Sequence, residues 1–323
     1  MAGGQERILR RRIRSVQATK KITRAMELIA ASRIVKAQAR VHAAVPYANG
    51  ITDVVRNLQA AGASTHPMLV EREKVQRVAQ VVVTADRGLC GAYNSSVIRA
   101  AEAEIRDHAA LGRDYALFTV GRKAEGYFRF RNYRIDGQWA GFSDNPTYED
   151  ARAIAAPLLA AYEAGEIDRV QLAYTRFVSA GRQEVVVRAL LPLGDEDLMP
   201  GEAGTDDAVE GGYEFEPAPE TILDTLLPRY AEARVYAALL NAAASEHAAR
   251  QRAMKAATDN AEDLIRSLTR IMNRARQDSI TTEIMEIVGG AEALRAGQEP
   301  TEHTEERPHP DERVYFDPTP MRA

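Results

Sequence analysis

Apolar residues recur every three or four positions along roughly the first sixty residues of the chain. This spacing is typical of one face of an α-helix. Some fifty residues of such a helix would extend roughly 75 Å at 1.5 Å per residue, so it has to pair with another long element. We expect Pro46 to kink or break this helix. The stripe consists of Ile13, Val16, Ile22, Met26, Ile29, Ala30, Val41, Val45, Val55 and Leu58.

A second helical stripe occupies the end of the chain, from about Glu220 to Val288. Its spacings of three and four residues are those of a coiled-coil seam. We expect its continuous part to start near Pro228 and to stop at Gly289-Gly290. Because the two stripes bracket the rest of the chain, their helices can pair only antiparallel. The seam residues are Leu264, Leu268, Ile271, Ala275, Ile280, Ile284 and Ile287.

Short apolar runs alternate with helical patterns in the middle of the chain. The pattern predicts strands over 78–83, 116–120, 170–174 and 184–191, and helices over 97–110, 123–128 and 148–164. Alternation of this kind is typical of an α/β domain with a mostly parallel sheet. Asn94 or Ser95 is the expected cap of the first of these helices.

The predicted fold class is therefore α/β plus a long antiparallel coiled coil. The N- and C-terminal helices pair as a shaft and bracket a Rossmann-like α/β insert. We divide the chain into an N-terminal coiled-coil helix, an α/β domain, an acidic loop, a C-terminal coiled-coil helix and a disordered acidic tail. The respective ranges are 1–60, 75–193, 194–219, 220–290 and 291–323.

Charge is segregated along the chain. Residues 1–40 carry eleven Lys and Arg against two acids, whereas residues 189–228 carry eleven acids and no Lys or Arg. Such segregation indicates surfaces for different partners. The one cysteine excludes an internal disulfide and favours a reducing cytoplasm. We find no signal peptide and no apolar stretch long enough to span a bilayer, so we expect any membrane association to occur through partners.

A glycine-bearing loop follows the first predicted strand and is the strongest candidate for a binding or catalytic site. Asp86, Arg87, Gly88 and Gly91 form a strand-to-helix turn that could hold a phosphate at a helix N-terminus. The loop lacks the GxGxxG spacing and the lysine of a P-loop, so a tight turn that needs glycine is the favoured interpretation. Cys90 could be a nucleophile beside this helix, but a small buried residue is the better expectation.

Other catalytic or binding patterns are weak. The six histidines are not spaced as metal ligands, and we expect no cofactor, no metal and no catalytic residues. The basic run of residues 10–14 (RRRIR) could bind nucleic acid, but it lies on an apolar-striped helix without interleaved aromatics. We therefore expect no nucleic-acid partner.

Three stretches in order along the chain resemble the gamma subunits of F-type ATP synthases. The first is residues 20–33 (KKITRAMELIAASR), and the second is residues 84–94 (TADRGLCGAYN). The third comprises residues 244–260 (ASEHAARQRAMKAATDN), 273–277 (NRARQ) and 280–291 (ITTEIMEIVGGA). The resemblance extends over about residues 1–294.

This resemblance implies a rotor rather than an enzyme. The helical pair would turn inside a hexamer of alpha and beta subunits, with its foot beside epsilon on the membrane ring of c subunits. Proton flow would turn the ring, and the shaft would force the beta subunits through their nucleotide states. The resemblance also implies one copy per complex, on the cytoplasmic side of a bacterial cell membrane and touching the membrane only through the c-ring.

Residue roles follow from the resemblance alone. Met26 matches the methionine that faces an acidic loop of beta, and Arg276 with Gln277 matches the pair that contacts a beta catch loop. Arg250, Thr281 and Glu283 match positions implicated in coupling, and the resemblance implies that these residues also contact the beta subunits. The acidic tail from residue 297 extends beyond where such chains commonly end, and a latch that limits ATP hydrolysis is a hypothesis for it.

Two alternatives remain open at this point. One is a free-standing α/β nucleotide-binding enzyme with helical arms. The other is a coiled-coil scaffold, or a nucleic-acid binder that uses its basic helix. Tight nucleotide binding by the isolated chain would favour the first, and recovery from solubilised membranes without alpha, beta and epsilon subunits would contradict the rotor interpretation.

Overall fold

The computed structural model describes residues 2–60, 66–193 and 216–296. The predicted acidic loop falls outside the described residues up to residue 215, and the predicted tail does so from residue 297. The chain divides into two compact units. One unit consists of Met1–Ile13 with Ser267–Ala323, and the other is Arg14–Arg266.

Two long helices begin and end the described chain. They are α1 (Ala2–Ala60) and α5 (Pro219–Ala296). Within the larger unit they run antiparallel, because contacts move down one helix as they move up the other. Thr52 Oγ1 lies 3.3 Å from the Tyr230 hydroxyl, and Lys20 Nζ lies 3.1 Å from Glu262 Oε2. Between these, the buried hydroxyls of Thr23 and Thr258 are 2.8 Å apart.

Helix α1 continues through Pro46, so the predicted break is wrong. A proline inside a helix lacks the amide donor of one backbone hydrogen bond and costs about 3 kcal/mol. Packing of the next turns offsets that cost: Ile51, Val55 and Leu58 are buried in the main hydrophobic core. Each fully buried aliphatic side chain of this size contributes about 1.5–3 kcal/mol.

Helix α5 departs from its predicted ends in the same way. It begins at Pro219 and includes Pro228, and it passes through Gly289-Gly290 to Ala296. A Cβ placed on either glycine would meet nothing within 4 Å. Good helix formers follow at Ala291-Glu-Ala-Leu294, which offsets the cost of about 1 kcal/mol that each helical glycine carries.

A five-stranded sheet lies between the long helices in sequence, in the order β3-β2-β1-β4-β5. Strands β1, β2, β3 and β4 pair in parallel, and β5 pairs antiparallel with β4. The predicted α/β fold with a mostly parallel sheet is confirmed. The strands are β1 (Arg77–Val83), β2 (Asp114–Val120), β3 (Gly137–Trp139), β4 (Arg169–Phe177) and β5 (Gln183–Leu191).

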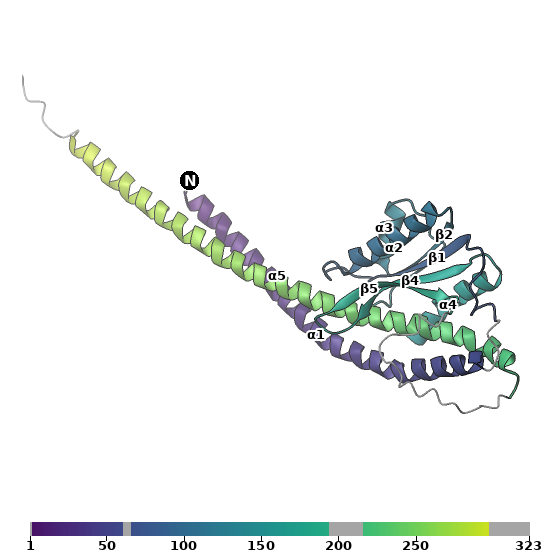
Figure 1. The fold of residues 1–323 in the computed structure, drawn as a ribbon. Helices are drawn as coiled ribbons and strands as arrows, with labels where there is room; N and C mark the ends of the chain where they lie inside the picture. The colour runs from purple at the N-terminus through teal and green to yellow at the C-terminus, as the bar shows by residue number, and fades with distance from the viewer. Residues whose placement is uncertain (1, 61–65, 194–215, 297–323) are drawn as a thin grey trace, which may run out of the picture. The chain divides into compact units, whose positions relative to one another are not determined.

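Helices cover both faces of this sheet (Figure 1). Helices α2 (Tyr93–Ala110) and α3 (Arg122–Phe130) pack on one face, in a core that includes Val97, Ala124 and Phe128. Helix α4 (Tyr148–Glu163) packs on the other face in the main core, together with parts of α1 and α5. The shaft helices therefore form part of the α/β domain's own core.

Two local expectations differ from the structure. Strand β3 was not predicted, because three residues give too short a pattern to read. Helix α2 starts after Ala92 without a side-chain cap, so neither Asn94 nor Ser95 caps it. The Asn94 side chain instead accepts the amide hydrogen of Ala85 at 2.9 Å, which fastens the loop before the helix.

The predicted seam is only partly buried. Leu268 is buried and Ala275 is partly buried, whereas Leu264, Ile271, Ile280, Ile284 and Ile287 are exposed. Helix α5 has 78 residues and α1 has 59. Among the described residues, no helix is long and apolar enough to cross a membrane.

Candidate functional site

The turn after strand β1 is built around the carboxylate of Asp86. Oδ2 accepts the amide hydrogens of Gly141 at 2.8 Å and Ser143 at 3.1 Å, and Oδ1 accepts that of Arg122 at 3.2 Å. The Asp86 amide donates to Ser143 Oγ at 2.9 Å. Asp86 thus joins the loop after β1 to the first residue of α3 and to the segment after β3.

Gly91 of the same turn lies against helix α5 and needs glycine for its backbone conformation rather than for space. Gly91 has a φ of +59°, which disfavours other residues, and a Cβ there would lie 3.7 Å from the Ala253 side chain. Cys90 is buried, as expected, and burial raises the pKa of its thiol while the charge of Arg250 opposes the shift. The favoured interpretation as a tight turn agrees with this packing.

Arg250 of α5 reaches this turn from within the chain. Its Nη2 donates to Glu246 Oε1 at 2.6 Å and to the carbonyl oxygen of Gly88 at 3.3 Å. The Arg250 side chain is 14% exposed and that of Glu246 only 2%. Glu246 and Arg250 are one helical turn apart on α5, so both face the turn after β1.

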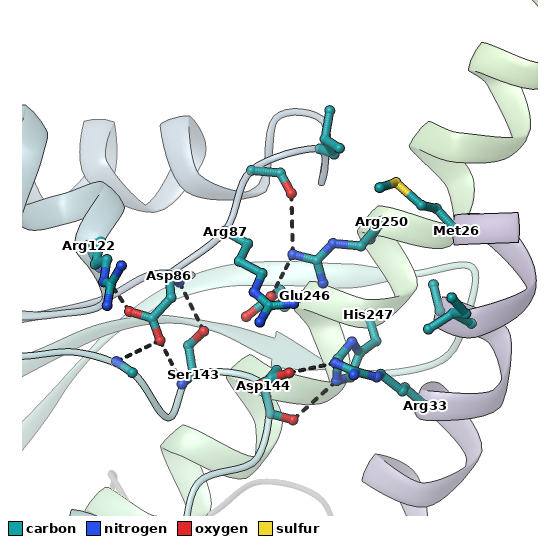
Figure 2. Close-up of a pocket in the computed structure, with 15 residues that line it drawn as sticks. Met26, Arg33, Asp86, Arg87, Arg122, Ser143, Asp144, Glu246, His247 and Arg250 are labelled. Carbon is teal, nitrogen blue, oxygen red and sulfur yellow. Dashed lines mark hydrogen bonds and ion pairs between the residues drawn. The ribbon is translucent and has the colours of Figure 1, made fainter. Parts of the chain in front are cut away.

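The segment after β3 binds both long helices through Asp144. Arg33 of α1 donates to the Asp144 carboxylate, and His247 Nε2 of α5 lies 3.2 Å from the Asp144 carbonyl oxygen. Arg40 of α1 donates to the neighbouring Asn145 side chain and Pro146 carbonyl. We call Arg33, Asp86, Gly88, Ser143, Asp144, Glu246, His247 and Arg250 the junction. Figure 2 labels all of them except Gly88 and shows how their side chains lie.

A cavity of about 410 Å³ opens beside the junction. Met26 and Ile29 of α1 line one side of it, and Arg87 and Leu89 of the β1–α2 loop line another. The sequence-predicted residues Met26 and Arg250, 224 positions apart in the chain, thus meet at one cavity (Figure 2). Asp86, Arg87 and Gly88 also line it, and Gly91 lies in a neighbouring hollow under α5.

Burial shifts the titration of two junction residues. It raises the pKa of Glu246, although Arg250 and the hydroxyl of Ser143 act to lower it. It lowers the pKa of His247, and the charges of Arg250 and Arg33 add to that effect. A neutral His247 fits its environment, whereas at Glu246 burial and the charge of Arg250 act in opposite directions. Among the described residues, no group of three or more His, Cys, Asp or Glu side chains could hold a metal ion.

The remaining predicted contacts lie in the smaller unit, on α5. Arg276, Gln277, Thr281 and Glu283 are all exposed. The only hydrogen bond described among them joins the Ser279 hydroxyl to Glu283 Oε1 at 3.5 Å. Among the described residues of this unit, no ion pair involves any of these four side chains.

Sequence reasoning did not assign a role to several junction residues. Asp144, Ser143 and Arg33 carry no pattern that separates them from ordinary surface residues. Glu246 and His247 did carry a signal, because they interrupt an alanine-rich helical run in which charged residues have no obvious place. The i,i+4 spacing of Glu246 and Arg250 was a further hint of a buried pair.

Comparison with known proteins identifies relatives along nearly the whole chain. The profile of the ATP synthase family matches residues 5–294. The ATP synthase gamma chain of Frankia casuarinae is 53% identical over 302 residues, which covers 91% of this chain and 99% of the relative. That of Mycolicibacterium smegmatis is 51% identical over 305 residues and covers 89% and 97%.

Solved structures give the same picture of the fold. The central stalk and c-ring structure of the Tetrahymena thermophila mitochondrial ATP synthase contains a similar chain, with a TM-score of 0.54 and 25% identity. The alignment covers 73% of this chain and 99% of that one. A chain of the Euglena gracilis mitochondrial ATP synthase has a TM-score of 0.63 at 18% identity, covering 94% and 99%. With paired long helices, an α/β insert and these relatives, the chain belongs to the ATP synthase gamma chain family.

Proposed function

We propose that this chain is the rotor of an F-type ATP synthase and transmits torque between a proton-driven c-ring and the beta subunits. In this role it makes or breaks no bond itself, and ATP is synthesised or hydrolysed on beta. The observation that carries the proposal is the antiparallel pair of α1 and α5, joined to the α/β domain by the junction. Two helices packed along their length resist bending and twisting better than either alone.

The proposed partners are the alpha and beta subunits around the shaft, and epsilon and the c-ring at the α/β domain. One copy would serve each complex, as a peripheral subunit on the cytoplasmic side of the cell membrane, touching the membrane only through the c-ring. No cofactor or nucleic acid is part of this proposal. The family membership supports it, and so does the exposure of the apolar residues Ile22, Leu28 and Val35 along α1.

Two surfaces are proposed to meet the beta subunits. Arg276, Gln277, Thr281 and Glu283 form one on α5, where exposed polar groups can bond to carboxylates or amides of a passing loop. The other is the rim of the cavity at Met26 and Arg87. Arg87 is exposed there and makes no ion pair among those described in the structure. An acidic loop of beta would complement it.

Rotation of the chain inside its assembled complex tests the proposal directly. The native Cys90 is buried, so a single reactive thiol can be added as Leu111→Cys at the exposed end of α2. A bead attached there should rotate in one direction when the alpha and beta subunits are immobilised and ATP is supplied. The same complex with a non-hydrolysable ATP analogue is the control. A bead that stays still while the complex hydrolyses ATP would contradict the rotor proposal.

A further inference from the structure

Arg250 has its bonding partners inside this chain. Its guanidinium bridges the buried carboxylate of Glu246, 2.6 Å away, and the backbone carbonyl of Gly88, 3.3 Å away. Glu246 lies on the same helix, whereas Gly88 lies in the loop after β1. The side chain therefore links α5 to the α/β domain. Because it is only 14% exposed, little of its surface is accessible to another subunit.

The link continues through the rest of the junction. Asp86, two residues before Gly88, holds the amides of Gly141 and Ser143. The next residue, Asp144, holds Arg33 of α1 and His247 of α5. A closed polar network thus passes from α5 through two loops of the α/β domain and back to both shaft helices (Figure 2). A charge-assisted network of this kind fixes the relative position of its members better than apolar contact alone.

The geometry points to Arg250 as a positioning residue, which acts in coupling by holding helix α5 to the β1–α2 loop through Glu246 and Gly88. In this role it does not act by touching a beta subunit. The inference rests on the proposed rotor function, since a joint between the shaft and the α/β domain matters only if torque crosses it. Residues that act through one shared network have non-additive effects when they are changed together.

The charges of Glu246 and Arg250 determine how a substitution of either residue affects the link between α5 and the β1–α2 loop. Loss of Arg250 would leave the Glu246 carboxylate buried without its cation, which is strongly unfavourable. Glu246→Gln keeps the shape of the side chain and removes its charge, and Arg250→Lys keeps the charge and removes the fork that reaches two acceptors. Each of these variants weakens the same link in a different way. Glu246→Gln and Arg250→Lys are conservative, so they can be measured even if the Arg250→Ala complex fails to assemble.

The test uses the assembled complex and hydrogen exchange of the β1–α2 loop. The amides of Ala85 and Asp86 are protected by Asn94 and Ser143, so they report on the position of this loop. We expect Arg250→Ala to speed exchange over residues 84–93 about tenfold, which corresponds to about 1.4 kcal/mol. Glu246→Gln should act in the same direction, and the double variant should add little to Arg250→Ala.

A matched control lies on the same helix. Arg266 also pairs with a glutamate four residues earlier, Glu262, at 3.0 Å, but its side chain is exposed. Arg266→Ala should leave exchange in the β1–α2 loop at the wild-type rate. In the rotation assay, a bead at Leu111→Cys should fluctuate over a wider angle during pauses in the Arg250→Ala complex than in the Arg266→Ala complex.

The outcomes separate this inference from the rotor proposal. If Arg250→Ala lowers ATP synthesis while loop exchange and bead fluctuation stay at wild-type values, Arg250 acts on another subunit and the inference is wrong. The same conclusion follows if the fold-losses in ATP synthesis caused by Arg250→Ala and by Glu246→Gln multiply in the double variant. Failure of the wild-type bead to rotate would instead refute the rotor proposal, whatever the exchange of the loop shows.

Discussion

Gly121 is the position at which one added methyl group should do most harm. It lies between β2 and α3 with φ of +91° and ψ of 140°, and its amide donates to the Trp139 carbonyl at 2.8 Å. A Cβ in this conformation would lie 2.2 Å from the Thr84 carbonyl oxygen and 2.7 Å from its carbon. Ordinary contacts start at about 3.4 Å, so Gly121→Ala requires the backbone of one of two neighbouring strands to move.

Two costs add at this position. A non-glycine residue in a sparsely populated backbone region costs about 1–3 kcal/mol. Displacement of Thr84 also disturbs the hydrogen bond from its amide to the Val120 carbonyl, which is 2.8 Å long, and a typical bond contributes about 1 kcal/mol. We therefore expect Gly121→Ala to lower the free energy of unfolding by about 3 kcal/mol or more. Because Thr84 precedes the Asp86 turn, the junction should loosen as well.

Urea unfolding of the purified chain measures this effect against an internal control. Gly126 lies within α3, only five residues away, and a Cβ there would meet nothing within 4 Å. Gly126→Ala should raise the free energy of unfolding by about 0.5–1 kcal/mol, because alanine loses less backbone entropy in a helix. Equal unfolding free energies for Gly121→Ala and Gly126→Ala would contradict the close approach of Gly121 to the Thr84 carbonyl.

Three further variants probe other parts of the chain. Arg276→Ala with Gln277→Ala should lower ATPase activity and coupling of the complex without preventing assembly, and full activity would remove both from the proposed beta contact. Burial acts to raise the pKa of Asp168. The amides of Arg77 and Gln76 and the charge of Arg72 outweigh this effect and lower the pKa below its ordinary value of 3.8. Its ionised form therefore stabilises the fold above that pH. Asp168→Asn should cost about 1–3 kcal/mol at pH 7 in urea unfolding, with a smaller difference at pH 3; an equal cost at both values would contradict the assignment. Pro46→Ala should raise the free energy of unfolding by up to about 3 kcal/mol, and no gain would show that α1 bends to accommodate the proline.

The layered core could be predicted from the sequence because its signals are local. Residues 78–83 are a short apolar run bounded by polar and turn residues, and the structure has β1 there as Arg77–Val83. The same holds for α4, where the pattern over 148–164 corresponds to Tyr148–Glu163. A Thr147–Asp150 capping box marks the start of α4 in the structure. Strand β3 could not be found in this way, since three residues carry no periodicity.

The errors at Pro46 and Gly289 have a common physical origin. Both residues disfavour a helix locally, and a reading of single positions therefore ends the helix at each of them. The structure continues α1 through Pro46 because Ile51, Val55 and Leu58 are buried against the α/β core beyond it. That core also includes residues more than a hundred positions away, such as Leu223 and Tyr230, which no local pattern contains.

The junction was the least predictable feature, because its members come from four separate parts of the chain. Arg33 belongs to α1, Asp86 and Asp144 to two loops of the α/β domain, and Glu246 to α5. No spacing rule relates Arg33, Asp86 and Asp144 to Glu246, and each of these first three residues alone has the pattern of an ordinary charge. What distinguishes them is burial with a partner: a carboxylate such as that of Glu246 remains inside a protein only where a cation accompanies it. Such a pair has to be held by the elements around it. A joint between shaft and α/β domain is one reason for a chain to keep charges at a position where apolar side chains would pack with less cost.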